Sequence, residues 1–236
     1  MRPAAAIACR TATRNAARCP RSAPPAPSAT RRRSLCQFGV KRRHLRTDPT
    51  ANIKLASVKS DGFHTWFEDE IAQFERYHPV GTKPRLALAL LLYTAQRRSD
   101  VVRKGRQHVK DGVLTVKQQK TGATLAIPVH PHLQAVLNAT PSEHLTFLVT
   151  ATGKPYGPNH FSETFREWCN AAELPKRCTA HGLRKAACRR LAEAGCSANE
   201  IASISGHASL DEVARYTKAA DQARLARNAL RKAVIR

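Results

Sequence analysis

Residues 179–217 read TAHGLRKAACRRLAEAGCSANEIASISGHASLDEVARYT and carry most of the candidate chemistry of the chain. His181 and Arg184 stand three residues apart at the start of a helical pattern, so their side chains share one face of the helix. His207 and Tyr216 follow in the same stretch. A guanidinium, two imidazoles and a phenol that meet in space suit the binding of an anionic phosphate beside an oxygen nucleophile. The stretch therefore predicts part of a phosphate site, which upstream elements would complete.

Helix-capping signals divide these residues into separate helices. Thr179 is placed to cap a helix that stops at Gly195, where a glycine suits the turn after a helix. The sequences SANE (197–200) and SLDE (209–212) are capping boxes, so two short helices are expected to follow. A last amphipathic helix is expected from about residue 219 to residue 234.

The preceding residues predict an α+β domain that is mainly helical, with one small antiparallel β-sheet. A capping box, TWFE (65–68), starts a helix with apolar residues at helical spacing. Residues 85–96 read RLALALLLYTAQ, and their nearly continuous apolar surface predicts the central core helix. Two segments with period-2 alternation, 113–118 and 123–129, predict a β-hairpin or a small three-stranded sheet with Lys120 at the tip. The other expected elements are a short helix capped by Ser99 or Asp100, a helix from Pro131 to about Asn138, a short strand at 146–150 and an amphipathic helix at 159–172.

The charge of the chain points to nucleic acid as its partner. The formal net charge is +23, which is far too basic for a neutral metabolic enzyme. The excess is uneven, because residues 1–47 hold 12 Lys and Arg and no acid, whereas residues 48–236 hold 28 Lys and Arg and 17 acids. The second part alone is therefore at +11, which still suits a DNA-binding protein.

Cysteine usage and hydropathy exclude several other classes of protein. Seven cysteines are scattered without a C-x-x-C spacing, which argues against a disulfide scaffold or a zinc site and for a reducing compartment. Cys188 and Cys196 are expected to pack as small apolar residues. No run of about 18 apolar residues occurs, so no membrane span is expected.

Residues 1–47 are rich in Ala, Arg, Pro and Ser and show no apolar periodicity. We expect them to form a disordered basic segment, followed by a linker at 48–63 and a folded domain at 64–236. Three interpretations of the segment stay open: a basic DNA-binding arm, an Arg-rich transit peptide without acids, or sequence that was never shaped into a domain.

Any one of the candidate residues has an ordinary structural explanation, but their order along the chain is specific. Arg97 stands in TAQRRSD (94–100) after the core helix, and Lys120 opens the hairpin turn KTG (120–122). The boxes HGLR (181–184), GH (206–207) and RYT (215–217) follow. The ordered set resembles the catalytic domain of the tyrosine recombinases, the phage-integrase family, over residues 55–225.

The resemblance implies a site-specific DNA recombinase, or integrase, of a mobile element. In such enzymes a tyrosine hydroxyl, here that of Tyr216, attacks a DNA phosphodiester and leaves a covalent 3′-phosphotyrosine with a free 5′-hydroxyl. Arg97 and Arg184 would clamp the non-bridging phosphate oxygens and stabilise the charge of the transition state. The covalent bond conserves the energy for rejoining, so no ATP, metal or other cofactor is expected.

The same resemblance assigns the remaining polar groups and the partner. Lys120 is expected to protonate the leaving 5′-oxygen, from a hairpin tip that reaches into the minor groove. His181 would accept or relay the proton of Tyr216, and His207 would donate a hydrogen bond to the phosphate. The implied partner is double-stranded DNA, bound by a homotetramer that is a monomer in free solution, in the bacterial cytoplasm at the nucleoid.

Two departures from the family pattern affect these expectations. Ala95 stands where the family usually carries glycine, and a small residue suffices there if its φ is negative. Family members also carry a helical core-binding domain before the catalytic domain, and residues 1–54 do not have its composition. We therefore expect an intact catalytic domain in a truncated or frame-disrupted copy, which binds DNA weakly and recombines poorly or not at all.

Two alternative functions fit part of the same residues. Residues 197–217 also resemble a helix-turn-helix, which would make the chain a non-catalytic DNA-binding protein. That function leaves the motif contexts of Arg97, Lys120 and His181 unexplained. A topoisomerase-like enzyme that nicks and closes strands would use the same chemistry, but the style of the HGLR and GH boxes favours the recombinase.

Overall fold

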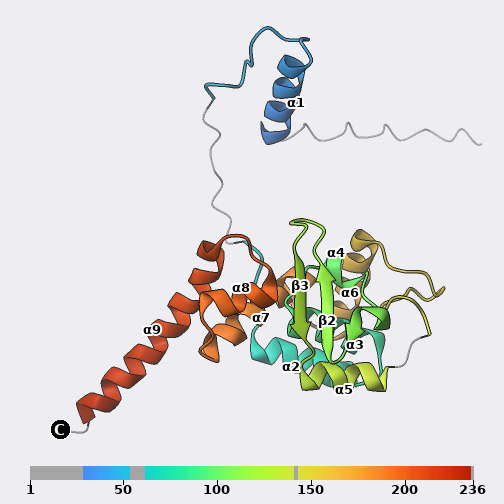
Figure 1. The fold of residues 1–236 in the computed structure, drawn as a ribbon, viewed down its shortest axis with the longest axis vertical. Coiled ribbons are helices and arrows are strands. Elements are labelled where there is room, and N and C mark those ends of the chain that lie inside the picture. The colour runs from blue at the N-terminus through green and yellow to red at the C-terminus, as the bar shows by residue number, and fades with distance from the viewer. Residues whose placement is uncertain (1–28, 54–61, 141–142, 235–236) are drawn as a thin grey trace, which may run out of the picture. The chain divides into compact units, whose positions relative to one another are not determined.

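The computed structural model describes residues 29–53, 62–140 and 143–234 (Figure 1). The chain divides into two compact units, Met1–Ser60 and Asp61–Arg236. The described part of the first unit contains the helix α1 (Ala29–Lys41) and a turn after it. In that turn the carboxylate of Asp48 accepts hydrogen bonds from the backbone N–H and the hydroxyl of Thr50.

Helix α1 corrects the expectation of disorder for residues 29–41. The sequence ATRRRSLCQFGVK contains no proline, and about half of it is Ala, Arg, Leu, Gln or Lys, which favour a helix. The average composition of residues 1–47 hid this segment, because every proline of that region lies before residue 28. Residues 1–28, for which the same expectation was made, lie outside the described part of the chain.

The second unit combines helices with one small sheet. Its elements, in chain order, are α2 (Glu68–Tyr77), α3 (Lys83–Thr94), α4 (Arg98–Val101), the 3₁₀ turn η1 (Arg106–His108), β1 (Val109–Lys110), β2 (Val113–Lys117), β3 (Thr124–Pro128), α5 (Pro131–Ala139), α6 (Pro158–Ala171), α7 (Ala180–Glu193), α8 (Ala198–Ser205) and α9 (Leu210–Val234). This confirms the predicted class of fold (Figure 1). None of the described helices is both long and apolar enough to cross a membrane.

Helix α3 is the central core helix that the sequence predicts. Thr82 caps it by accepting a hydrogen bond from the backbone N–H of Arg85, and Pro84 lies in the first turn. Residues 86–92 are all buried, and the helix packs against α5 and α7. Each fully buried leucine contributes roughly 1.5–3 kcal/mol of hydrophobic free energy. This packing fixes the C-terminal end of α3, from which Arg97 follows.

Helix α2 begins at Glu68, two residues later than the capping box at 65–68 predicts. The carboxylate of Glu70, not that of Glu68, accepts a hydrogen bond of 2.8 Å from the backbone N–H of Phe67. The shift has a packing cause, because Trp66 is fully buried and its indole N–H donates to the carbonyl of Thr179 at 2.9 Å. The indole therefore holds the start of α2 against the start of α7.

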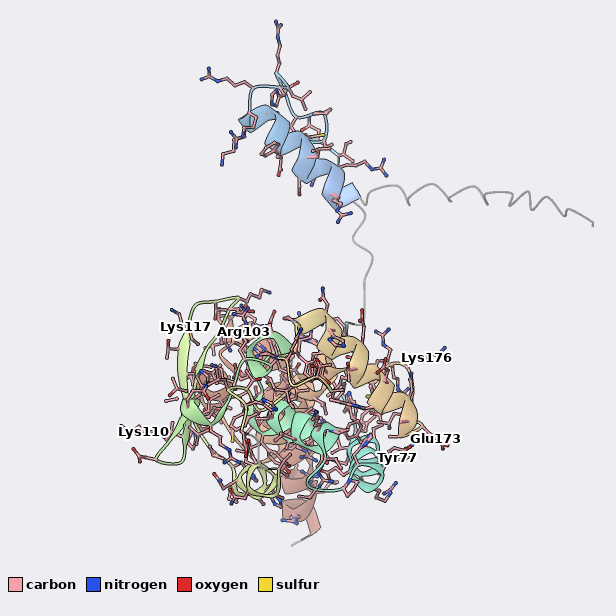
Figure 2. The ribbon with its side chains drawn as sticks, turned by 90° about the vertical axis from the view of Figure 1, so that its right-hand side faces the viewer. Tyr77, Arg103, Lys110, Lys117, Glu173 and Lys176 are labelled. Atoms are coloured by element: carbon pink, nitrogen blue, oxygen red, sulfur yellow. The ribbon has the colours of Figure 1, made fainter. Side chains whose placement is uncertain are left out.

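The sheet is antiparallel, with the strand order β1-β2-β3. Lys117 pairs with Thr124, which confirms the predicted hairpin and leaves residues 118–123 to form its turn. An apolar cluster of sheet residues packs against Ile204 of α8. Lys110 and Lys117 lie toward opposite ends of the sheet (Figure 2). The hairpin turn is thereby supported from its base by α8.

The predicted strand at 146–150 is wrong. Within it only Val149 makes a bridge, to Pro155, around a turn in which Gly153 has a φ of +75°. Residues with β propensity form a strand only when a partner strand pairs with them, and here the segment pairs across its own turn and not with the sheet.

The predicted cap of α4 is also wrong. Ser99 and Asp100 lie inside the helix, and Arg97 is the residue that precedes its first turn. Asp100 is instead buried, and its carboxylate accepts the backbone N–H of Gln119 at 2.9 Å. This bond attaches the hairpin turn to α4, so a residue expected at a helix end connects two elements.

Helices α7 and α8 begin as predicted, with Thr179 as the cap of α7 and the capping box 197–200 at the start of α8. The two helices expected after them are one continuous helix, α9 (Figure 1). Residues 210–234 contain no glycine or proline and are rich in Ala, Leu, Arg and Lys. The helix therefore continues through residue 219, where the sequence suggested a separate start.

Candidate active site

The six residues that the motifs single out line one hollow of the second unit, with a volume of about 400 Å³. Its lining residues are Arg97, Lys120, His181, Arg184, Lys185, His207, Glu212, Arg215 and Tyr216. They come from the junction of α3 and α4, the hairpin turn, the first two turns of α7, the residue pair after α8 and the first two turns of α9. Distant parts of the sequence thus meet in one mainly cationic cavity.

Arg184 lies on α7 and is 3% exposed. Its Nη1 donates a hydrogen bond of 2.8 Å to the carbonyl of Ala95, whereas its buried Nη2 has no hydrogen-bond partner among the described residues. Burial, and then the nearby charge of Arg97, lower the pKa of Arg184 to about 10. The side chain is still charged at neutral pH, so a buried cationic donor lines the cavity without an acceptor. An anion is the ligand that satisfies such a donor.

Arg97 follows the end of α3, where the chain changes direction. Ala95 ends the helix in the left-handed region, with a φ of +52°. The negative φ under which alanine was expected to replace the family's glycine without strain is therefore not found. Arg97 Nη1 donates to Gln118 Oε1 at 3.2 Å, which joins it to the base of the hairpin turn. The guanidinium is half-buried and lines the same hollow as that of Arg184.

His181 opens α7, one turn before Arg184. Its ring lies 4.5 Å, centroid to centroid, from that of Phe63. Burial first, and then the charges of Arg184 and Lys185, lower the pKa of His181 below its ordinary value. The imidazole is therefore unprotonated at neutral pH and is able to accept a proton.

Gly182 explains why the box around His181 contains a glycine. A Cβ built on Gly182 would lie 2.3 Å from the carbonyl oxygen of His64 and 2.7 Å from Cδ1 of Trp66. The chain before α2 therefore packs directly on the backbone of α7. This contact orients the first turn of α7, and with it His181 and Arg184.

His207 follows the glycine that ends α8, where Gly206 has a φ of +68°. Burial, and then the charge of Arg184, lower the pKa of His207 to about 4, against the weaker opposite effect of Glu212. Its Nδ1 lies 2.7 Å from the hydroxyl of Ser205. When Ser205 donates this bond, the neutral ring carries its proton on Nε2, where it is available for a ligand.

Tyr216 is half-buried on α9, three residues after Val213, which is fully buried. Residues three apart share a helix face, and α9 packs against α7, so this packing turns the phenol toward the cavity. Burial, and then Cys188, raise the pKa of Tyr216 to about 12, while Arg184 acts in the opposite direction. The free chain therefore keeps the phenol protonated at neutral pH.

Lys120 lies exposed in the hairpin turn. The turn is closed by a hydrogen bond of 3.0 Å from the backbone N–H of Gly122 to the carbonyl of Gln118, and Gly122 has a φ of +73°. The backbone fixes the turn, from which the exposed side chain of Lys120 lines the hollow.

Lys185 and Glu212 also line the hollow and were not predicted from the motifs, and Arg215 was named only as the motif neighbour of Tyr216. Glu212 precedes Tyr216 by four residues, a spacing that places both on one helix face and would have found it once α9 was known to start at Leu210. Its Oε2 lies 3.6 Å from Nε2 of His207. Glu212 is the one carboxylate among the residues that line the hollow.

One cluster outside the hollow has the residue types of a metal site. The ligand atoms of His64, Glu70 and Cys178 all lie within 4.8 Å of one another. The Glu70 carboxylate is already used, since it accepts from the N–H of Phe67, pairs with His64 at 2.7 Å and binds Arg177 at 3.2 Å. Burial raises the pKa of the Cys178 thiol to about 12, so the thiolate that a metal needs is disfavoured. We interpret the cluster as a structural hydrogen-bond network.

Comparison with known sequences gives one family. The model of the phage integrase family matches residues 68–223. The integrase of Escherichia phage HK022 is 28% identical over 142 residues, which are 56% of this chain and 39% of that integrase. The chain thus spans about two fifths of the length of this curated relative.

Solved structures with the same fold include a lambda integrase dimer bound to a COC′ core site, with a TM-score of 0.68 and 22% identity over 80% of this chain and 70% of that one. A lambda integrase tetramer bound to a Holliday junction has a TM-score of 0.62 and 24% identity, over 76% and 57% of the two chains. XerA recombinase has a TM-score of 0.60 and 18% identity, and the match covers 85% of this chain and 76% of that one. At these identities the likeness establishes the fold.

Proposed function

The chain belongs to the phage integrase family, and on that basis we propose that its second unit breaks and rejoins double-stranded DNA as a site-specific recombinase. The observation that carries the proposal is the unpaired, buried guanidinium nitrogen of Arg184 in a hollow that Tyr216 also lines. A DNA phosphodiester supplies the anion that this nitrogen lacks and brings phosphorus next to a phenol nucleophile.

In the proposed step the Tyr216 oxygen attacks phosphorus, and a phosphorus–oxygen bond to the tyrosine forms as the bond to the 5′-oxygen breaks. The phenol proton passes to His181, and a proton from Lys120 passes to the leaving 5′-oxygen. Arg97 and Arg184 bind the non-bridging oxygens, whose negative charge increases in the transition state. Rejoining is the reverse reaction with the 5′-hydroxyl of another strand, so the energy of the broken bond is retained.

The protonation states of the free cavity suit these roles. The lowered pKa of His181 leaves it as a base at neutral pH, and the lowered pKa of His207 leaves it as a neutral donor to phosphate. The raised pKa of Tyr216 opposes premature ionisation, and Arg184 favours the phenolate as the proton leaves. The nucleophile is thus activated only when a base and a phosphate meet in the cavity.

The basic charge supports DNA as the substrate, because Lys and Arg side chains outside the cavity contribute to backbone binding. We extend to this chain the tetramer that lambda integrase forms on a Holliday junction, as the species that exchanges strands on DNA. We also propose that the chain is a monomer when it is free of DNA.

A covalent adduct on a nicked suicide substrate tests the proposal. The chain is incubated with a pool of nicked duplexes of randomised sequence, which trap the cleaved state because a short strand diffuses away, and the products are separated on a denaturing gel. We expect a DNA–protein adduct from the wild type and none from Tyr216→Phe. Tyr77→Phe, at an exposed position of α2, is the matched control and should form the adduct at the wild-type level (Figure 2).

The alternatives give different results in this experiment and in an assay with supercoiled DNA. Failure of the wild type to form an adduct, with DNA binding retained, would replace the recombinase by a non-catalytic DNA-binding protein. Relaxation of supercoiled DNA without exchange of strands between duplexes would favour a nicking and closing enzyme.

A further inference from the structure

Two buried glutamines adjoin the cavity without lining it. Gln96 and Gln118 are each 1% exposed. Gln96 directly precedes Arg97, and Gln118 lies two residues before Lys120. A hydrogen bond of 2.7 Å runs from Gln118 Nε2 to Gln96 Oε1. The pair therefore links the junction of α3 and α4 with the end of β2.

The carboxamide of Gln118 uses both of its ends. Its Nε2 also donates to the carbonyl of Ser205, the last residue of α8, at 2.9 Å. Its Oε1 accepts from Nη1 of Arg97 at 3.2 Å and from the hydroxyl of Thr121 in the hairpin turn at 2.8 Å. One side chain thus has two acceptors at its nitrogen and two donors at its oxygen, which fixes the orientation of the amide.

Gln96 extends the contact to α8. Its Nε2 donates to the carbonyl of Ile204 at 2.7 Å and to that of Thr94 at 3.0 Å. The backbone that leads to His207 also packs against the pair, because a Cβ built on Gly206 would lie 2.4 Å from Gln118 Nε2. The glycine before His207 is therefore required by the position of Gln118 as well as by its own positive φ.

We propose that Gln118 is a positioning residue for phosphoryl transfer, which sets Arg97, the Lys120 turn and the His207 segment relative to one another with Gln96 as its support. This inference rests on the function proposed above. Arg97 and Lys120 act on different oxygens of one phosphate, so an error of about 1 Å in their separation is expected to slow the reaction strongly. No backbone ladder joins the hairpin turn to α8 within the described chain, and the carboxamide contacts both.

Gln118→Met tests the role of the four hydrogen bonds, because methionine keeps a similar volume but offers no amide. Single-turnover cleavage at saturating DNA, well below the unfolding temperature, should slow about 10²-fold. Gln73→Met is the matched control, since Gln73 donates to the carbonyl of Ala172 at 2.8 Å and lies on α2 away from the cavity. We expect Gln73→Met to cleave at the wild-type rate, and a wild-type rate in Gln118→Met would overturn the proposal.

A second substrate distinguishes misplacement of Lys120 from a general loss of structure. Sulfur in place of the bridging 5′-oxygen leaves without protonation, because a thiolate is far less basic than an alkoxide. If Gln118 holds the Lys120 turn in place, the rate defect of Gln118→Met relative to the wild type should be about tenfold smaller on this substrate than on the ordinary one. An equal rate defect on the two substrates would show that Gln118 does not position the Lys120 turn.

Hydrogen exchange tests the inference without any DNA chemistry. The N–H of Gly122 donates to the carbonyl of Gln118 at 3.0 Å, so its exchange reports on the order of the hairpin turn. Protection of residues 119–123 should fall about tenfold in Gln118→Met and stay unchanged in Gln73→Met. If the wild type cleaves no DNA, the proposed function fails, but hydrogen exchange still tests whether Gln118 positions the hairpin turn. Unchanged protection of residues 119–123 in Gln118→Met would overturn that positioning role.

Discussion

Arg184 Nη1 donates a 2.8 Å hydrogen bond to the carbonyl of Ala95, a residue held at φ +52° and ψ +24°. The bond connects α7 to the junction that carries Arg97, so Arg97 and Arg184 both depend on one residue in the left-handed region. An alanine in this region costs about 1–2 kcal/mol relative to a right-handed conformation. The segment that positions the two guanidinium groups is therefore strained, and the surrounding packing holds it in place.

Replacing Ala95 by glycine should relieve this strain. Ala95→Gly loses a buried methyl group and gives the unfolded chain more conformational freedom. Ala87→Gly, in the middle of α3, has the same two effects but relieves no backbone strain, so it serves as the reference variant. Ala95→Gly should therefore have a free energy of unfolding about 1–2 kcal/mol higher than Ala87→Gly. Urea denaturation of the two variants measures the difference, and equal stabilities would show that the left-handed conformation carries no cost.

The buried guanidinium of Arg184 should not be replaceable by another cation. Arg184→Lys keeps the charge but removes the planar fork, of which Nη1 bonds Ala95 and Nη2 has no partner among the described residues. We expect the rate of adduct formation to fall by about 10²–10³. Arg189→Lys, on the same helix but paired with Glu68 outside the cavity, is the control and should leave the rate unchanged.

The sequence predicts much of this fold because its signals are local. Thr179 and the capping box 197–200 start their helices as expected, and the apolar run 85–96 lies in the buried α3 up to Thr94. The start of α2 is shifted for a tertiary reason, since burial of Trp66 keeps residues 65–67 outside the helix. The strand at 146–150 fails because strand pairing depends on a partner that no local pattern reveals.

The candidate site, too, could be predicted from the sequence only in part. Motif order is enough to select the six residues that line the hollow, but it says nothing about the residues that hold them. Gln118 appears in the sequence as one more polar residue of a hairpin, and Glu212 as part of a capping box. Their roles depend on which faces of β2, α8 and α9 meet, and that is decided by packing between elements far apart in the chain.

His207 should make the stability of the chain depend on pH. The pKa of His207 is about 4 in the folded chain, against an ordinary value of 6.5, because burial and Arg184 disfavour the charged ring. Between pH 6.5 and about 4 the unfolded chain binds a proton that the folded chain does not, so stability is lost as the pH falls through this window. Thermal unfolding between pH 7.5 and 4.5 should show a shallower decline for His207→Asn.

The control for this measurement is His160→Asn, at an exposed position on α6, which should decline as steeply as the wild type. His181 also has a lowered pKa, so part of the decline is expected to remain in His207→Asn. A decline in His207→Asn as steep as that of the wild type would show that His207 is not held neutral by the fold.

Glu212 should weaken the binding of phosphate to the cavity. It is the one carboxylate among the lining residues, and Glu212→Gln removes its repulsion of an incoming anion. Its side chain is 71% exposed, so solvent screening limits the gain in affinity to about two- to fivefold. Binding of inorganic phosphate and of duplex DNA is measured in the Tyr216→Phe background, where no covalent step interferes. The gain should shrink as salt is added, because exposed charges are screened.

Asp211→Asn is the matched control, because it changes the net charge of α9 by the same amount from an exposed position that does not line the cavity. A general gain in DNA affinity from the added charge should appear equally in both variants, whereas the local gain should appear only in Glu212→Gln. If the two variants bind phosphate equally, Glu212 does not face the anion. The carboxylate would then act on His207 alone, whose pKa it raises.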